Sequence, residues 1–277
     1  MSEFAPSTAK GSDTANIHLQ LKGQERTVSV AFRPGQQSAR ELLPIARELA
    51  NHITEMAIEA IERQGRTISC RAGCAACCRQ IVCISLVDAY ALSELIAALP
   101  PKHQAIIRNR FAQAIRQLEH AGLLDPNEAR GNRRLVSLED GSDPNHAIRA
   151  VASRYFQLQI PCPFLDDEKC SIYDERPLVC REYHVTSPAE NCAHLYEIGV
   201  EALEVPIRMG EVLVRVAHQV AGASKESIPL VLALEWAEAH PQELARSTDS
   251  LQMLRSMVKE IDQEYASAFD QRELEAP

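Results

Sequence analysis

The chain has 277 residues, enough for one large domain or for one domain with a smaller appendage. Its apolar fraction of 45% and charged fraction of 24% are those of an ordinary globular protein, and only 5% of the residues are aromatic, which favours helix packing. The formal net charge of −9 argues against nucleic-acid binding, because phosphate recognition depends on clustered Lys and Arg.

The sequence also argues against membrane insertion and export. No apolar run approaches the roughly 20 residues that cross a bilayer. The first residues, MSEFAPSTAKGSDTAN, lack the basic and apolar regions of a secretory signal. We therefore expect a cytoplasmic protein with no membrane partner, whose thiols stay reduced.

Residues 1–36 are predicted to form an N-terminal arm and a β-hairpin. Residues 1–15, rich in Ser, Thr and Ala, are expected to be disordered. Residues 17–21 (IHLQL) and 26–32 (RTVSVAF) alternate apolar and polar side chains, which indicates two paired strands. Pro34 and Gly35 end the hairpin.

Residues 37–277 are predicted to form a mainly helical domain. Apolar residues recur at helical spacing from Ser38 to about Arg63; Ser38 and Glu41 have the spacing of a capping box, and Pro44 favours a later start of the regular helix. Ser85 is an N-cap candidate for the next helix. Further helices are predicted over 86–99, 101–122, 146–158, 194–221 and 229–239, and over a last segment that begins near Leu251. Residues 123–145 are expected to be a long polar loop.

The predicted fold class is therefore mainly α, with an irregular cysteine-rich metal-binding core wrapped by helices and a small N-terminal β-hairpin. The cysteines dominate residues 70–192. They fall into two sets of four: Cys70, Cys74, Cys77 and Cys78 in CRAGCAACC, and Cys162, Cys170, Cys180 and Cys192 beyond residue 160. Thiolates suit tetrahedral Zn²⁺ or the iron atoms of an Fe–S cluster. Dense thiols in a reducing compartment, odd in number, indicate metal rather than disulfides.

The spacing of the first set limits how it can hold a metal. As one helix, residues 70–78 would place the four sulfurs on one face within about 100°, but over about 12 Å along the axis. A single zinc needs sulfurs about 4 Å apart. Either a helix starts near Gly73, with Cys70 reaching in from the preceding turn, or the two sets mix. We favour mixing, in which Cys74, Cys77 and Cys78 form a compact corner that distant cysteines complete.

Several residues near the cysteines in the sequence have two possible roles. Four arginines are candidates to offset thiolate charge or are ordinary surface residues: Arg71, Arg79, Arg176 and Arg181. Two histidines are alternative ligands or structural residues: His184 and His194. Two tyrosines are candidate hydrogen-bond donors to sulfur or packing residues: Tyr173 and Tyr183. The ninth cysteine, Cys83, lies in an apolar run and is predicted to be a buried small hydrophobe.

The motifs CRAGCAACC, CPFL, CSIY and ERPLVCR, with the late Cys192, resemble the YkgJ-like cysteine-cluster family (CxxCxxCC), described as zinc- or iron-chelating. The resemblance covers roughly residues 70–192. It implies a metal ion as partner and the eight cysteines as ligands: Cys70, Cys74, Cys77, Cys78, Cys162, Cys170, Cys180 and Cys192. It leaves open which metal is bound, whether as an Fe–S cluster, and whether the protein is an enzyme.

Two catalytic alternatives remain. One relative in this group is a flagellin lysine methylase with an Fe–S centre, so the resemblance includes an Fe–S-dependent methylase-like or redox enzyme; the sequence shows no Gly-rich nucleotide-binding turn. Cys70, Cys74 and Cys77 also fit the CxxxCxxC spacing of radical S-adenosylmethionine enzymes. The sequence lacks the β/α alternation those enzymes need, and Ala76 replaces the usual aromatic residue.

Overall fold

A computed structural model describes residues 4–9, 12–21, 23–71, 73–136 and 144–275. Its N-terminal sheet has the order β1-β2-β3, with β1 at Phe4–Ala9, β2 at Ser12–Leu21 and β3 at Gln24–Phe32. β2 and β3 pair antiparallel from Asp13↔Phe32 to Leu21↔Gln24, which confirms the predicted hairpin. Alternate side chains such as Ile17 and Val30 are buried, as expected for a sheet covered on one face.

The expected disorder of residues 1–15 is wrong where the structure describes them. β1 pairs antiparallel with β2, from Phe4↔Ile17 to Ala9↔Ser12. The composition of this Ser- and Thr-containing segment alone suggested disorder. The β2 edge of the hairpin offers free backbone groups, and pairing with them satisfies the backbone hydrogen bonds of β1.

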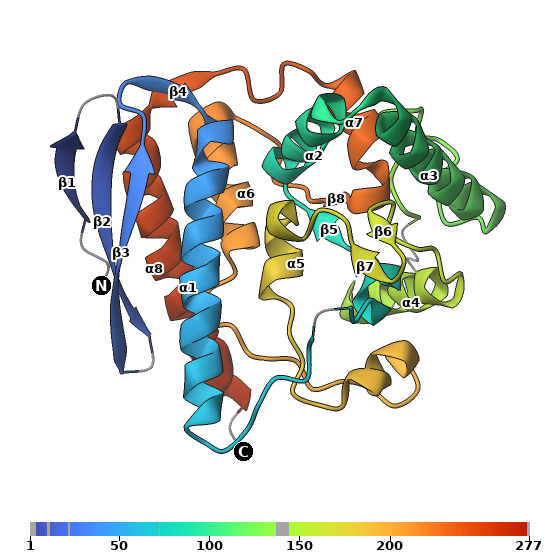
Figure 1. The fold of residues 1–277 in the computed structure, drawn as a ribbon, viewed down its shortest axis with the longest axis horizontal. Helices are drawn as coiled ribbons and strands as arrows, with labels where there is room; N and C mark the ends of the chain where they lie inside the picture. The colour runs from blue at the N-terminus through green and yellow to red at the C-terminus, as the bar shows by residue number, and fades with distance from the viewer. Residues whose placement is uncertain (1–3, 10–11, 22, 72, 137–143, 276–277) are drawn as a thin grey trace.

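The long helix α1, Leu42–Glu62, lies against this sheet (Figure 1). A short 3-10 turn, η1 at Ala39–Glu41, precedes it, and the Ser38 hydroxyl accepts the Arg40 N–H at 3.3 Å. The regular helix therefore begins at Leu42, one turn after Ser38, in agreement with the later start that Pro44 favours. Strand β4, Gln36–Ser38, pairs with β9, Ser247–Asp249. This pairing joins the segment before α1 to the segment before the C-terminal helix.

Two further helices complete the regular part of the molecule. α6, Met209–Ala221, contacts both α1 and α8, Ser250–Glu275. The buried faces of these helices include Leu49, Val212, Val216 and Met257. Sheet and helices contribute to one hydrophobic core.

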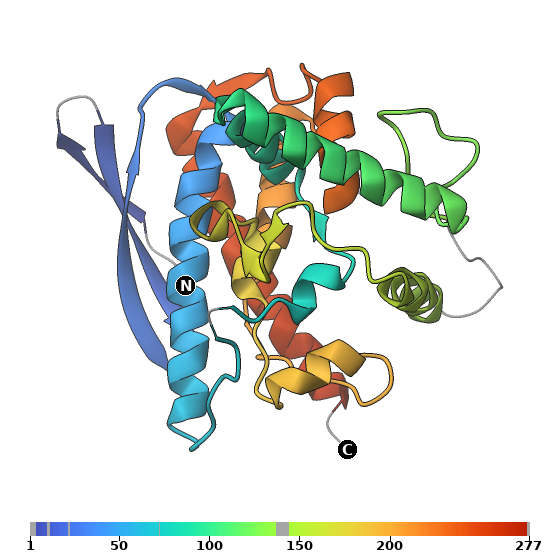
Figure 2. The ribbon, with the colours of Figure 1, turned by 45° about the vertical axis from the view of Figure 1, so that its right-hand side comes forward.

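A second group of helices lies on the other side of α6 (Figures 1 and 2). α2, Leu86–Ala98, starts at the predicted N-cap, where the Ser85 hydroxyl accepts the Asp88 N–H at 3.0 Å. α2 packs on α7, Ala233–Ala239, which follows the 3-10 turn η5 at Leu230–Leu232. α3, Pro101–His120, and α4, Pro144–Gln157, confirm two more predicted helices.

Between these two groups the chain is irregular. The short elements there are η2 (Ala76–Arg79), β5 (Cys83–Ile84) paired with β8 (Ile228–Pro229), β6 (Leu165–Asp166) paired with β7 (Lys169–Cys170), η3 (Tyr173–Glu175), α5 (Leu178–Glu182) and η4 (Ala189–His194).

The predicted helix over 194–221 is half wrong. Residues 195–208 are not helical, and only 209–221 form α6. Gly199 has a φ of +81°, and Pro206 lies just before α6. The segment pairs instead with residues 184–186, through Thr186 N–H to Glu201 O at 2.9 Å and Leu203 N–H to His184 O at 2.8 Å. Backbone pairing with residues 184–186 therefore keeps this segment extended, although its apolar spacing favoured a helix.

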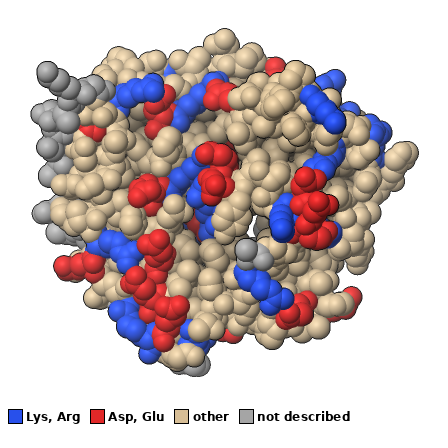
Figure 3. Space-filling view, viewed as in Figure 1, with Lys and Arg blue, Asp and Glu red and all other residues tan. Residues whose placement is uncertain are grey.

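The structure confirms the mainly helical fold with a cysteine-rich irregular centre. No helix among the described residues is both long and apolar enough to span a bilayer. On the face shown in Figure 3, Lys and Arg lie beside Asp and Glu in mixed groups.

Candidate metal centre

The first cysteine set is held by short turns rather than by a helix. Gly73 has a φ of +82°, a conformation that favours glycine, and it turns the chain just before Cys74. Cys77 and Cys78 then lie in the 3-10 turn η2. The Val185 N–H donates to Cys70 Sγ at 3.4 Å, and the Ser69 N–H donates to Val185 O. The first set is thereby fixed to the segment that follows Cys180.

A two-residue hairpin accounts for the spacing between Cys162 and Cys170. β6 and β7 pair through Leu165↔Cys170, and the turn residues Asp167 and Glu168 both have positive φ, at 46° and 57°. Such a turn matches the twist of the flanking strands. The hairpin folds Cys170 back beside Cys162, whose N–H donates to Cys78 O at 2.7 Å. This bond joins the two sets directly.

The last two cysteines arrive on short helices. Cys180 lies in α5, which packs against α1 and α6. Cys192 lies in η4, which contacts η2, and its side chain is buried. The remaining seven of the eight cysteines are half-buried.

Cys77 interacts with thiols of both sets. Burial is the main cause that raises the pKa of Cys70, Cys162, Cys170, Cys180 and Cys192, and repulsion from Cys77 raises each of them further. Cys77 itself has a raised pKa, first because of its hydrogen bond with the Cys78 thiol and then because of burial.

Six of the other seven cysteines form two lobes, and Cys78 hydrogen-bonds with Cys77. The first lobe is Cys70, Cys74 and Cys192, which interact with one another. The second lobe is Cys162, Cys170 and Cys180, which also interact among themselves. The two sets therefore lie side by side, with Cys192 near the first set and the backbone of Cys78 bonded to Cys162. That ligands from both sets share one shell stays a prediction.

The thiols are gathered but not closed into a coordination shell. Among the described residues, no three His, Cys, Asp or Glu side chains converge tightly enough to hold a metal ion. The donor set itself, soft sulfur from eight cysteines, fits zinc or iron.

Arg176 is the basic residue placed to offset thiolate charge. It lowers the pKa of Cys70, Cys77 and Cys170 against the larger effect of burial and neighbouring thiols. Its guanidinium stacks on the Tyr173 ring at 4.0 Å, and its buried Nε has no hydrogen-bond partner among the residues that the structure describes. A buried orphan N–H beside thiols is a donor suited to metal-bound sulfur.

The other three arginines mainly have different partners. Arg79 binds both carboxylate oxygens of Glu168 on the β6-β7 turn, at 2.6 and 3.0 Å. Arg71 is exposed and lies 3.6 Å from Glu190. Arg181 donates to the carbonyls of Arg176 and Asp174.

The histidines and tyrosines also separate into different environments. His194 is exposed and lies 3.2 Å from Glu197. His184 is half-buried, and burial lowers its pKa. Tyr173 is 56% exposed and stacks on Arg176, whereas burial raises the pKa of Tyr183, to which Cys192, Cys77 and Cys70 add. Of these four residues, only Tyr183 interacts with several thiols.

The prediction that Cys83 is a buried hydrophobe is wrong. Cys83 and Ile84 alternate in β5, so that Ile84 is 2% exposed while Cys83 is exposed to solvent inside a cavity. Its thiol hydrogen-bonds with Ser227. Cys83 is thus separate from the two lobes.

Sequence reasoning missed the buried carboxyls that lie behind the cysteines. Asp88 is 2% exposed, accepts the Ser85 hydroxyl at 2.7 Å and lies near Cys180. Burial raises the pKa of Glu182 to about 8, although it accepts the Met209 N–H at 2.5 Å at the start of α6. In the sequence, the ERPLVCRE segment carried no signal that its last Glu is buried.

Residues 69–198 match the family model "CxxCxxCC: Putative zinc- or iron-chelating domain". The match confirms the predicted resemblance. It covers a little under half of the chain and contains both cysteine sets. No curated protein and no solved structure matches the chain. The matched region is thus described as zinc- or iron-chelating, and the N-terminal sheet and C-terminal helices lie outside it.

Proposed function

We propose that the protein binds zinc or iron through the eight cysteines of both sets, with Cys77 and Cys78 joining two four-thiol sites. One site is the first lobe with Cys77, and the other is the second lobe with Cys78. The observation that carries this proposal is that backbone contacts bring the two sets together: the Cys162 N–H donates to Cys78 O at 2.7 Å, and η4, which holds Cys192, contacts η2.

The number of thiols argues for more than one metal atom. A tetrahedral zinc takes four ligands, so eight thiolates suit two ions or one polynuclear centre. Adjacent residues such as Cys77 and Cys78 cannot easily serve one small shell, but they can each serve a neighbouring shell. Arg176 would offset part of the resulting negative charge and donate its buried Nε–H to sulfur.

An Fe–S centre that supports redox chemistry or catalysis is the second candidate. Two features support it: a buried N–H donor beside sulfur, which tunes such clusters, and a cavity that shares the α5 segment with the thiols. A closed Cys₄ zinc site would instead make the centre structural, because it leaves no coordination position open.

The test is metal and acid-labile sulfide content, measured with a visible spectrum on protein purified without oxygen. Two zinc ions per chain and no colour would support paired zinc sites. A brown protein with iron and sulfide would support the Fe–S alternative. A metal-free protein under both growth conditions, zinc-rich and iron-rich, would overturn both.

Serine variants test the ligand assignment. Cys77→Ser should lower metal content by half or more, because Cys77 belongs to the contact between the sites. Cys83→Ser is the matched control, since Cys83 lies outside both lobes and should keep its full metal content. Equal metal content in the two variants would contradict the assignment.

A further inference from the structure

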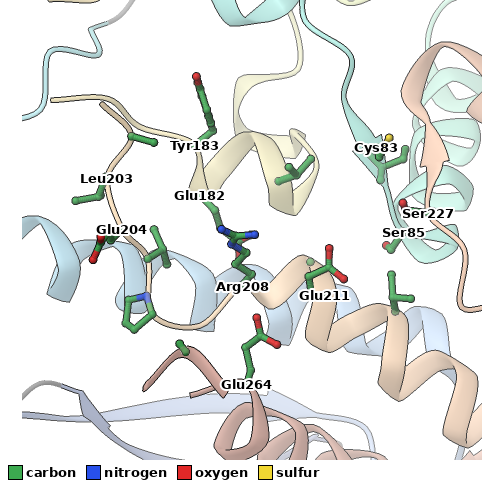
Figure 4. A pocket seen from close by; sticks show the side chains of 18 of the residues that line it. Cys83, Ser85, Glu182, Tyr183, Leu203, Glu204, Arg208, Glu211, Ser227 and Glu264 are labelled. Carbon is green, nitrogen blue, oxygen red and sulfur yellow. The ribbon is translucent and has the colours of Figure 1, made fainter. Parts of the chain in front are cut away.

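A cavity of about 760 Å³ lies between α5, α6, α8 and the 202–206 segment. Its size falls within the range of small-molecule sites. Figure 4 shows its labelled side chains, with Glu182 and Arg208 at the centre and Cys83, Ser85 and Ser227 at one end. The cavity is separate from the thiol cluster. α5 contributes to both, because Cys180 lies in this helix, and Val179, Glu182 and the following Tyr183 line the cavity.

Carboxylates outnumber basic groups in this cavity. The described lining residues include five acidic side chains, Asp88, Glu182, Glu204, Glu211 and Glu264, against one arginine, Arg208. Arg208 lies beside Glu182 in Figure 4 and lowers the pKa that burial raises. The guanidinium of Arg208 therefore offsets part of the acidic lining of the cavity.

The remaining acidic side chains come from different elements and face a common space. Glu211 is in the first turn of α6 and is exposed to the cavity, and in the described part of the chain it has no hydrogen-bond or ion-pair partner. Glu264, from α8, binds Arg215 at 2.7 Å and presents its side chain toward α6 (Figure 4). Arg215 also binds the buried Glu260, so its single positive charge is shared by two carboxylates and offsets only part of the charge of Glu264.

The arrangement of the lining side chains favours an organic cation over a metal ion. The carboxylates do not converge on a metal-sized point, since no three acidic, cysteine or histidine side chains of the described residues can hold an ion. Apolar side chains, including Val179, Val205 and Val214, line the same space. Separated carboxyl groups such as those of Glu211 and Glu264, with apolar surface beside them, suit an ammonium group on a hydrocarbon chain.

We propose that this cavity binds a small organic cation, an alkyl amine or polyamine, with Glu211 as its main charged contact. The site is distinct from the proposed metal centre and does not depend on it. Because Glu211 is exposed within the cavity, its contribution is modest, and its loss should weaken binding about fivefold.

The experiment is calorimetric titration of the purified full chain with spermidine, with 1,4-butanediol as the uncharged chain and Mg²⁺ as the inorganic cation. Saturable binding of spermidine at one site, without binding of the diol or of Mg²⁺, is expected. Absence of spermidine binding, or equally tight binding of the diol or Mg²⁺, would overturn the proposal.

Two variants locate the site. Glu211→Gln should weaken spermidine binding about fivefold, whereas Glu55→Gln removes the same charge from an exposed position on α1 and should leave it unchanged. Equal weakening in both would show a diffuse effect of net charge and would reject the cavity. The titration repeated on Cys77→Ser separates this proposal from the metal centre, because binding should survive loss of metal.

Discussion

The regular part of the molecule and its cysteine-bearing part are stabilised in different ways. The sheet, α1, α6 and α8 bury continuous apolar faces, and residues such as Leu49, Val212 and Met257 are fully buried. The described residues of the cysteine-bearing segments, 66–85 and 158–208, form turns, two-residue strands and helices of at most six residues. Isolated helices of that length are not stable in water, so this part depends on tertiary contacts, which include the burial of Phe164 and Leu178 in the core. Under the proposed function, metal binding adds cross-links to these contacts.

Metal removal should have the largest effect of the changes considered, and it should act on the cysteine-bearing part alone. Stripping the metal with a chelator should raise amide hydrogen exchange throughout 66–85 and 158–208, while α1 and α6 stay protected. The scale is large, since structural zinc contributes about 10 kcal/mol or more in small zinc domains. Hydrogen exchange read by mass spectrometry checks it, and returning the metal should restore protection. Equal loss in both regions, or no loss in either, would contradict the division.

Leu49→Ala tests the other side of the comparison. Leu49 is completely buried in α1, so the change should lower the free energy of unfolding by about 2–5 kcal/mol through lost burial and a cavity. Denaturant unfolding measures the loss, and metal content per folded chain should be unchanged. A variant that folds but loses metal would show that the core also shapes the thiol site.

The two parts also differed in how far the sequence predicted them. Periodic apolar residues located α1 and α8, and Ser85 marked the start of α2 correctly, because these elements follow local rules. Residues 195–208 and the strand β1 escaped prediction, since each is held by pairing with a distant or neighbouring segment.

For the candidate site, spacing alone indicated that the two sets mix, but not how. The exchange of Cys192 into the first lobe depends on the contact of η4 with η2, which no local pattern encodes. The exposure of Cys83 likewise follows from the pairing of β5 with β8. The burial of Asp88 and Glu182 is a tertiary result of α2 and α5 packing near α6.

Arg176→Met should have an intermediate effect confined to the cysteine-bearing part. The change removes the charge and the buried Nε–H beside the thiols while keeping a similar apolar length. Loss of such a supporting donor typically costs 10- to 100-fold in metal affinity, about 1.4–2.7 kcal/mol. Competition with a chelator of known affinity measures this. Arg71→Met is the control, because Arg71 is exposed and should change affinity little; equal losses would remove the special role of Arg176.

Arg79→Met should have the smallest effect of the series. Arg79 holds Glu168 in a two-point ion pair that fastens the β6-β7 turn to η2, but Glu168 is 62% exposed in its side chain. Exposed pairs contribute about 0–1 kcal/mol, and salt screens them. We therefore expect a small loss of stability, measured by thermal unfolding at low salt, that disappears at high salt. A larger, salt-independent loss accompanied by loss of metal would mean that this pair sets the distance between η2 and Cys170, and the second lobe would then depend on a surface contact as well as on its thiols.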